Sequence, residues 1–381
     1  MTAATLDQVP LLARTEARPV PSARVTTAVG QSHRLAGGSI DRARPLGFSF
    51  DGRAYSGFAG DTLASALVAN GVKLVARSFK YPRPRGILTA GAEDGHVFDD
   101  GTAARLADDH YYLTTTTANA ARVMQHLEHA RQILWASLEV RLASATDQWA
   151  QYALAGPRSR ALLAELLSDA ADVSDAALPY IAAFRWCGVP TRLFRLSFSG
   201  ERAYEIAVPS AYGDALIRAV EALDATPYGT EALGVMRIEK GHAAGNELDG
   251  RTTAADLGVS KMLSTKKNFI GRAMAAREGL TDPARPRLTG FVPVDRAQPL
   301  RAGAHLLAAG APATAAHDEG WLSSAAHSLT LGHAVALGCL AHGAERVGER
   351  VRAYDPVRGG DTLCEVVLPV FVDPEGARLR G

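Results

Sequence analysis

The stretch Leu196-Ser-Phe-Ser-Gly-Glu-Arg-Ala-Tyr-Glu-Ile-Ala-Val208 indicates the fold most clearly. Its centre, Ser199-Gly200-Glu201, is typical of a turn, so the pattern predicts two antiparallel strands joined at that point. After the turn the side chains alternate, and we expect two sets on opposite faces of a sheet. The sets are Ala203, Glu205 and Ala207 on one face, and Tyr204, Ile206 and Val208 on the other.

Two charged residues interrupt apolar runs in this region. Glu205 lies in the second strand, and Arg237 lies between Met236 and Ile238 in a helix expected over residues 227–241. A carboxylate among apolar residues needs a partner or a polar ligand. Spacing alone favours a pair between Glu205 and Arg237, or two side chains that face water. The alternative is that the two residues bind a small polar ligand.

Composition excludes several classes of protein. The 381 residues are 47% apolar, which is enough for two or three domains, and 41 Lys and Arg balance 40 Asp and Glu to a net charge of +1. This balance gives no electrostatic case for nucleic acid or membrane binding. The sequence shows no spanning apolar run and no apolar signal core, so we expect a cytoplasmic protein.

Residues 1–36, rich in Ala, Thr, Arg and Pro, are expected to form a mobile arm. After them, 46–50 and 53–58 flank an Asp-Gly turn, 62–70 has the N-cap and C-terminal glycine of a short helix, and 72–75 is a further strand. This order predicts a small β-grasp module over residues 37–91.

Two segments of this module, 45–71 and Arg77-Ser-Phe-Lys-Tyr-Pro-Arg-Pro-Arg-Gly-Ile-Leu88, resemble the N-terminal part of the alpha subunit of heterotetrameric sarcosine oxidase. Related subunits hold a [2Fe–2S] cluster here with four cysteines. The three cysteines of this chain, Cys187, Cys339 and Cys364, all lie outside the module. The expected role of the module is therefore structural or docking, and no metal site is expected.

After about residues 90–95 the sequence resembles a much later part of the same subunit. No G-x-G-x-x-G motif occurs, so the nucleotide-binding region is missing together with the first part of the folate domain. Residues 92–285 resemble the remaining aminomethyltransferase-like domain, the fold of the glycine cleavage T-protein. We expect strands at 109–117, 138–142, 149–154 and 187–193, and helices at 118–133, 157–167 and 211–223.

The last segment, residues 286–381, is expected to form a C-terminal β-barrel, because short strands alternate there with Gly, Pro and Asp turns. The expected strands are 289–293, 320–324, 332–339, 349–353 and 363–368. The fold class predicted for the whole chain is therefore α+β: a β-grasp module, a partial aminomethyltransferase-like folate-binding domain and a barrel.

The resemblance also assigns residues to a site. An acidic residue near the transferred carbon corresponds to Asp100 or Asp99 in His96-Val-Phe-Asp-Asp-Gly101, although composition alone predicts a plain turn there. Glu205 corresponds to the glutamate that recognises the pterin ring, and Arg237 to a further residue of the site. Tyr204 would stack on a ring or belong to the core. Lys267 would meet the glutamate tail of folate or be solvated.

The function that the resemblance implies is that of a sarcosine oxidase alpha subunit. Such a complex demethylates sarcosine oxidatively to glycine and transfers the one-carbon unit to tetrahydrofolate, with beta, gamma and delta subunits as partners. FAD, FMN and NAD are expected only in the intact family complex, so the chain alone should have no oxidase activity. The alternatives are a stand-alone folate-binding module and a non-catalytic remnant.

Overall fold

The computed structural model describes residues 31, 34, 40–50, 52–61, 63–70, 72, 76–77, 84–85, 95–168, 181–267 and 269–380. The chain divides into two units, which we describe separately. One contains residues 1–98, 253–255 and 259–285, and the other contains residues 99–252, 256–258 and 286–381. Among the described residues, none of the helices is long and apolar enough to cross a membrane.

The first unit contains the predicted N-terminal hairpin and helix. Strands β1 (Asp41–Phe50) and β2 (Arg53–Ala59) pair antiparallel, and Gly52 in the turn has a φ of 71°. Helix α1 (Leu63–Ala69) follows. Asp61, which precedes this helix, forms an ion pair with Arg34 at 2.7 Å. The remaining elements of this unit are β3 (Ala76–Arg77), β4 (Pro84–Arg85), α6 (Arg272–Ala275) and α7 (Glu278–Thr281). Most of the strand predicted at 72–75 lies outside the described residues.

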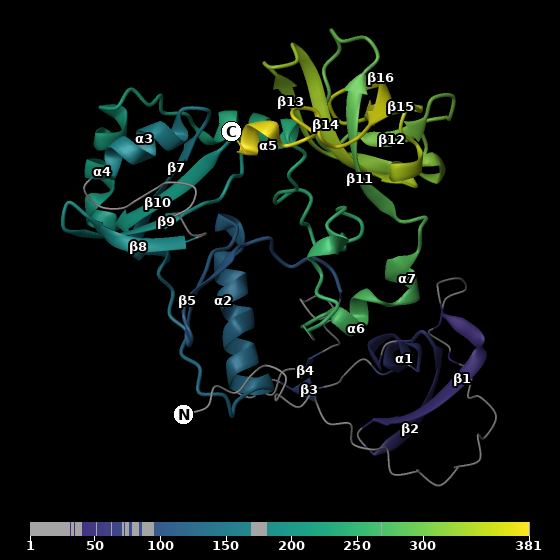
Figure 1. Ribbon diagram of the computed structural model, residues 1–381. Coiled ribbons are helices and arrows are strands. Elements are labelled where there is room, and N and C mark those ends of the chain that lie inside the picture. Colours follow the sequence, from purple (N-terminus) through teal and green to yellow (C-terminus); the bar gives the residue numbers. More distant parts are fainter. Residues whose placement is uncertain are drawn as a thin grey trace. The chain divides into compact units, whose positions relative to one another are not determined.

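The second unit contains a four-stranded antiparallel sheet with helices on one face (Figure 1). The strand order is β7-β10-β9-β8, and the bounds are β7 (Trp149–Ala155), β8 (Ile181–Trp186), β9 (Val189–Phe194) and β10 (Ala203–Pro209). The covering helices are α3 (Ser159–Leu166) and α4 (Gly213–Glu221). Leu163 and Leu216 from these helices pack with Tyr204, Ile206 and Leu193 of the sheet in one core. These two helices leave the other face of the sheet, which carries Glu205, uncovered, and we call it the free face.

The predicted hairpin has its turn in the expected place but a longer loop. Glu205 pairs with Phe194 and Ala207 with Arg192, so the ladder is centred between Ser199 and Gly200. Residues 195–197 are irregular and residues 198–202 form bends, which corrects the prediction that the strands begin at the turn. Gly200 has a φ of 85°, a conformation that favours glycine.

A second hairpin precedes the sheet. It consists of β5 (Ala103–Ala107) and β6 (His110–Leu113), and helix α2 (Ala120–His129) follows, continued by one π-helical segment (Ala130–Leu134). The strand predicted at 109–117 is thus shorter, and β5 was not predicted. The strand predicted at 138–142 is wrong, because those residues are irregular and Leu138 and Val140 are exposed. Alternation of side chains does not make a strand without a pairing partner.

The C-terminal part is a closed six-stranded barrel in the order β11-β14-β13-β12-β15-β16. This confirms the predicted barrel, and β12 is the strand that the sequence did not reveal. Side chains such as Leu306, Leu322 and Val351 fill its interior. The bounds are β11 (Pro286–Pro293), β12 (His305–Ala308), β13 (Gly320–Ser328), β14 (His333–Ala341), β15 (Arg350–Asp355) and β16 (Gly360–Val367).

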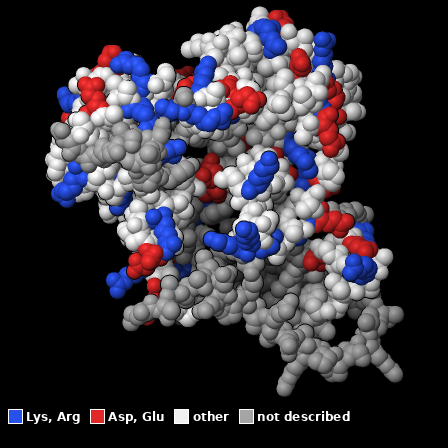
Figure 2. Space-filling model, in the orientation of Figure 1, with Lys and Arg blue, Asp and Glu red and all other residues white. Residues whose placement is uncertain are grey.

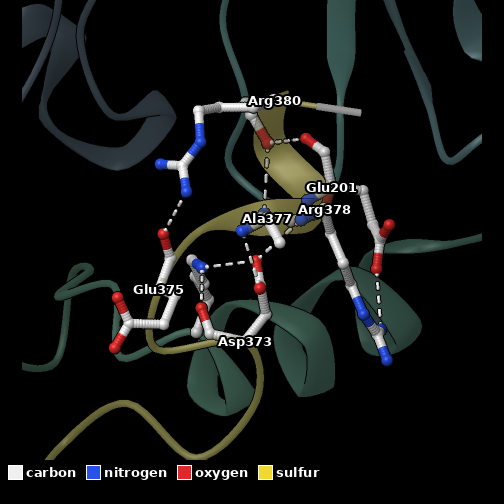
Figure 3. A network of polar contacts seen from close by, with 10 residues as sticks. Glu201, Asp373, Glu375, Ala377, Arg378 and Arg380 are labelled. Atoms are coloured by element: carbon white, nitrogen blue, oxygen red, sulfur yellow. Dashed lines mark hydrogen bonds and ion pairs between the residues drawn. The ribbon is translucent and has the colours of Figure 1, made fainter.

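The C-terminal segment ties the barrel back to the sheet (Figure 3). The amides of Phe371 and Val372 donate to the carbonyl of Glu239, the last residue of helix α5 (Thr230–Glu239). Arg378, in the short helix α8 (Ala377–Arg380), donates to Glu201 in the hairpin loop at 2.9 Å. These contacts fix the loop that follows β9.

Asp373 is the centre of this network. It accepts hydrogen bonds from Lys240 Nζ at 3.2 Å and from the amides of Ala377 and Arg378 at 2.7 and 3.1 Å. Burial alone would raise the pKa of Asp373, but these bonds outweigh it and hold the pKa below its usual value. The network is therefore complete at neutral pH and weakens in acid. Figure 2 shows acidic and basic side chains interspersed over the visible face, in line with the balanced composition.

Candidate functional site

Glu205 lies on the face of the sheet opposite the helices. Its neighbours in register are Ala153 on β7 and Phe194 on β9, both apolar. Gln151 donates one hydrogen bond to its Oε2 at 2.6 Å. Burial raises the pKa of Glu205, and the bond from Gln151 opposes only part of this shift. Glu205 is thus a half-buried carboxylate with one neutral partner, which leaves acceptor capacity for a ligand.

Gln151 also lines a cavity of about 700 Å³ beside β7. Helices α3 and α4 and residues 224–230 form its other walls, and most lining side chains are apolar. The lining includes neither Glu205 nor Asp100 nor Arg237. The cavity therefore adjoins the bond partner of Glu205, but it does not join the predicted site residues.

The adjacent carboxylates Asp99 and Asp100 have different environments. Asp99 accepts hydrogen bonds from the Gly101 amide, from the amide and the hydroxyl of Thr116, and from the side chain of Asn119, at 2.8 to 3.2 Å. These bonds close the base of the β5–β6 hairpin. Asp99 thus has a structural task, and its lone pairs are already used.

Asp100, in contrast, forms no side-chain hydrogen bond with any other residue in the described part of the chain. It is exposed on one side, yet enough protein surrounds it that desolvation raises the pKa of its carboxyl, with the charge of Asp99 adding to the effect. His242 acts in the opposite direction and lowers this pKa, so the two side chains lie close enough to interact electrostatically. Asp100 is therefore the member of the pair that is available to a ligand.

His242 follows helix α5 and contacts the loop after β9. Its Nδ1 lies 2.8 Å from the carbonyl oxygen of Phe198, and the two rings lie 5.9 Å apart. A carbonyl oxygen only accepts, so Nδ1 carries the proton that is shared with Phe198. This contact brings the hairpin loop, the end of α5 and Asp100 into one region.

Arg237 is buried, and its partners belong to the protein. Its guanidinium donates to Glu247 at 2.9 Å, to the Ser324 hydroxyl at 2.6 Å and to the carbonyl of His242 at 3.2 Å. Glu247 is 1% exposed and also accepts from Ser323. The network connects α5 to barrel strand β13. Arg237 therefore pairs with Glu247 instead of Glu205. The sequence spacing had favoured a pair with Glu205 or a side chain that faces water, and neither describes this arrangement.

Tyr204 lies on the helix-covered face of the sheet, and Lys267 lies in the first unit. The Tyr204 ring is 1% exposed and packs in the core beneath α3, and its hydroxyl accepts from Arg160 at 3.0 Å. This is the core alternative for Tyr204. Lys267 is exposed and belongs to the other unit, where its amide donates to Ser264 Oγ at 2.9 Å.

Four residues of this region were not predicted: Gln151, Arg192 and Tyr112 on the side of Glu205, and His242 on the side of Asp100. Gln151 and Arg192 could have been found from alternation, because both lie on the Glu205 face of neighbouring strands. Tyr112 and His242 reach the region through turns of the chain that no local pattern announces.

No group of three or more His, Cys, Asp or Glu side chains within the described ranges could hold a metal ion. The cysteines differ in accessibility. Cys187 is exposed, whereas Cys339 and Cys364 are fully buried and burial raises the pKa of each to about 12.

We therefore expect a thiol reagent such as a dithiobis-nitrobenzoate to modify one thiol per native chain and three in denaturant, because the reactive species is the thiolate. Absorbance of the released thiolate counts the sites. The Cys187→Ser variant serves as the control and should show no reaction while folded.

Family models match three parts of the chain. The GCVT N-terminal domain matches residues 84–267, and the glycine cleavage T-protein C-terminal barrel domain matches residues 287–373. A 2Fe-2S iron-sulfur cluster binding domain matches residues 43–98. That segment contains no cysteine, so it lacks the ligands of a [2Fe–2S] cluster. Together the sheet domain and the barrel define a chain of the T-protein class.

The chain belongs to the aminomethyltransferase family. It is 32% identical over 287 residues to the aminomethyltransferase of Mycobacterium avium (strain 104), covering 74% of this chain and 73% of that protein. An aminomethyltransferase T of the glycine cleavage system from Bartonella henselae has the same fold, with a TM-score of 0.60, 23% identity and coverage of 74% and 73%.

Within this family the sarcosine oxidase alpha subunits show a higher identity. The chain is 48% identical over 297 residues to the subunit of Rhizobium meliloti (strain 1021) and 39% identical over 300 residues to that of Corynebacterium sp. (strain P-1). Each match covers 76% of this chain and 30% of the relative, so the chain spans about a third of the length of these subunits. Both resemblances stated from the sequence are confirmed.

Proposed function

We propose that the chain binds tetrahydrofolate on the free face of the sheet, with Glu205 as the carboxylate that recognises the pterin. The observation that carries this proposal is the half-buried Glu205 with a raised pKa and one neutral partner, Gln151. The amino-pyrimidine edge of a pterin offers two N–H donors side by side, which one carboxylate can accept. A ligand of this kind would supply the bonds that Glu205 lacks.

Asp100 is the residue that acts at the transferred carbon in this proposal. Tetrahydrofolate, when bound, supplies the nitrogen N5 that accepts a one-carbon unit. Asp100 would accept a hydrogen bond from N5–H of tetrahydrofolate and would stabilise the positive charge of an iminium donor, because its carboxylate is partly desolvated and has no other partner in the described chain. Asp99 would hold Asp100 in place through its bonds to Thr116 and Asn119.

For the larger assembly we propose the role of a sarcosine oxidase alpha-subunit-like chain. The support is the similarity to the alpha subunits named above. Oxidation of sarcosine would then require beta, gamma and delta partners and the FAD, FMN and NAD of the intact complex. This chain would contribute the transfer of the one-carbon unit to folate.

Calorimetric titration of the chain with tetrahydrofolate tests the proposal. We expect binding by the unmodified chain and a loss of affinity of roughly 10–100-fold in Glu205→Gln, because the variant cannot accept two N–H groups with a charged carboxylate. Glu365→Gln, a half-buried glutamate of the barrel, is the matched control and should bind normally. Absence of binding by the unmodified chain, or normal binding by Glu205→Gln, would contradict the proposal.

The same titration should depend on pH. Burial raises the pKa values of both Glu205 and Asp100, so both lose their charge at a higher pH than ordinary carboxyls do. Affinity should therefore fall as the pH is lowered through these raised pKa values, and Glu205→Gln should show a weaker dependence.

A further inference from the structure

A stack of three rings and one guanidinium crosses the free face of the sheet. Tyr112 of β6 stacks on Phe194 of β9, with 5.5 Å between the ring centroids and 27° between the planes. The guanidinium of Arg192 lies 4.7 Å from the Tyr112 ring and 3.9 Å from the Trp149 ring of β7. Contacts of both kinds are attractive at these distances. The stack therefore joins the β5–β6 hairpin to two strands of the sheet.

The two ends of this connection are the two proposed site residues. Phe194 lies directly opposite Glu205 in the antiparallel register. Tyr112 pairs with Ala104 near the base of the hairpin, and that base is closed by Asp99, the residue before Asp100. Contacts thus lead from Glu205 through Phe194 to Tyr112, and the hairpin that carries Tyr112 leads on to Asp99 and Asp100 at its base.

Arg192 shows that the stack is more than a chance contact. Its Nη1 is buried and has no hydrogen-bond partner in the described part of the chain. An unsatisfied guanidinium nitrogen is costly to bury, and the aromatic faces of Tyr112 and Trp149 are the groups that offset this cost. Removal of the Tyr112 ring would leave Arg192 less stabilised and would release the hairpin.

We infer that Tyr112 is a positioning residue that sets the distance between Asp100 and Glu205. This inference rests on the proposed function for its consequence, while the mechanical connection can be tested without a ligand. A carboxylate that is displaced by about an ångström loses much of its effect on a bound substrate. Tyr112 acts through Asp100, so its loss should matter only while Asp100 has its carboxylate.

A double-mutant cycle on tetrahydrofolate affinity tests this connection. Tyr112→Ala should weaken binding about 3–10-fold, whereas Tyr112→Phe should stay within about twofold, because ring stacking is retained. In the Asp100→Asn background, Tyr112→Ala should cause no further loss. In the Glu205→Gln background it should cause the same loss as in the unmodified chain. Equal losses in all three backgrounds would overturn the inference.

A distance measurement gives a readout that does not depend on folate. Spin labels at Asp108→Cys, at the hairpin tip, and Ala183→Cys, on β8, report the distance between hairpin and sheet in a Cys187→Ser chain. We expect a narrow distribution with Tyr112 or Tyr112→Phe and a broad one with Tyr112→Ala. A narrow distribution in Tyr112→Ala would overturn the inference. If the unmodified chain does not bind folate but Tyr112→Ala broadens the distance distribution, the proposed function is refuted and the positioning role of Tyr112 stands.

Discussion

Replacement of Arg237 by methionine is expected to lower the free energy of unfolding by about 3–5 kcal/mol, because it leaves the charge of Glu247 buried without its partner. Glu247 is 1% exposed and receives its bonds from Arg237, Ser323, Ser324 and the Ala244 amide. The remaining hydroxyls and the amide are neutral donors and cannot replace a cation. Urea unfolding followed by circular dichroism measures the loss.

Two variants make this prediction specific. Arg218→Met breaks an exposed pair with Asp214 in α4, and it should leave the free energy of unfolding almost unchanged because water replaces the lost partner. The double variant Arg237→Met with Glu247→Met should recover much of the loss, because no buried charge is left. If Arg237→Met costs no more than Arg218→Met, the Arg237–Glu247 network does not hold α5 to the barrel.

The site could be predicted from the sequence only where local pattern determines it. Glu205 was singled out because its neighbours in the sequence are apolar, and its cross-strand neighbours Ala153 and Phe194 are apolar too, but its role at the pterin came from the resemblance alone. The barrel was predicted because Gly, Pro and Asp turns mark its strands. The four-residue β12 lacked such a signal, since it pairs with β13 and β15 over only a few positions.

Hydrogen-bond partners that are distant in the sequence could not be predicted from it. The side chains that satisfy Arg237 include Ser324, 87 positions later, and no spacing rule connects them. Tyr204 illustrates a different limit, because an aromatic residue on an alternating strand fits a ligand or a core equally well. Only the packing of α3 and α4 against that face places Tyr204 in the core.

The limit of prediction from sequence is clearest for Asp99 and Asp100, because two identical adjacent residues have no local feature that assigns them different roles. Asp99→Ala is expected to destabilise the β5–β6 hairpin by about 2–4 kcal/mol, because four hydrogen bonds to one carboxylate are lost. Asp100→Asn should leave stability unchanged or slightly improved. Its carboxyl makes no bond to other described side chains, and burial already favours the neutral form.

Amide hydrogen exchange separates the two roles at single residues. The amides of Gly101 and Thr116 both donate to Asp99, so they should exchange slowly in the unmodified chain and in Asp100→Asn, and rapidly in Asp99→Ala. Tetrahydrofolate affinity should fall in both variants, directly in Asp100→Asn and through displacement of Asp100 in Asp99→Ala. Rapid exchange in Asp100→Asn, with protection retained in Asp99→Ala, would reverse the assignment. The carboxylate at the reacting carbon would then be Asp99, because a residue that closes the hairpin base cannot at the same time keep its lone pairs free for a ligand.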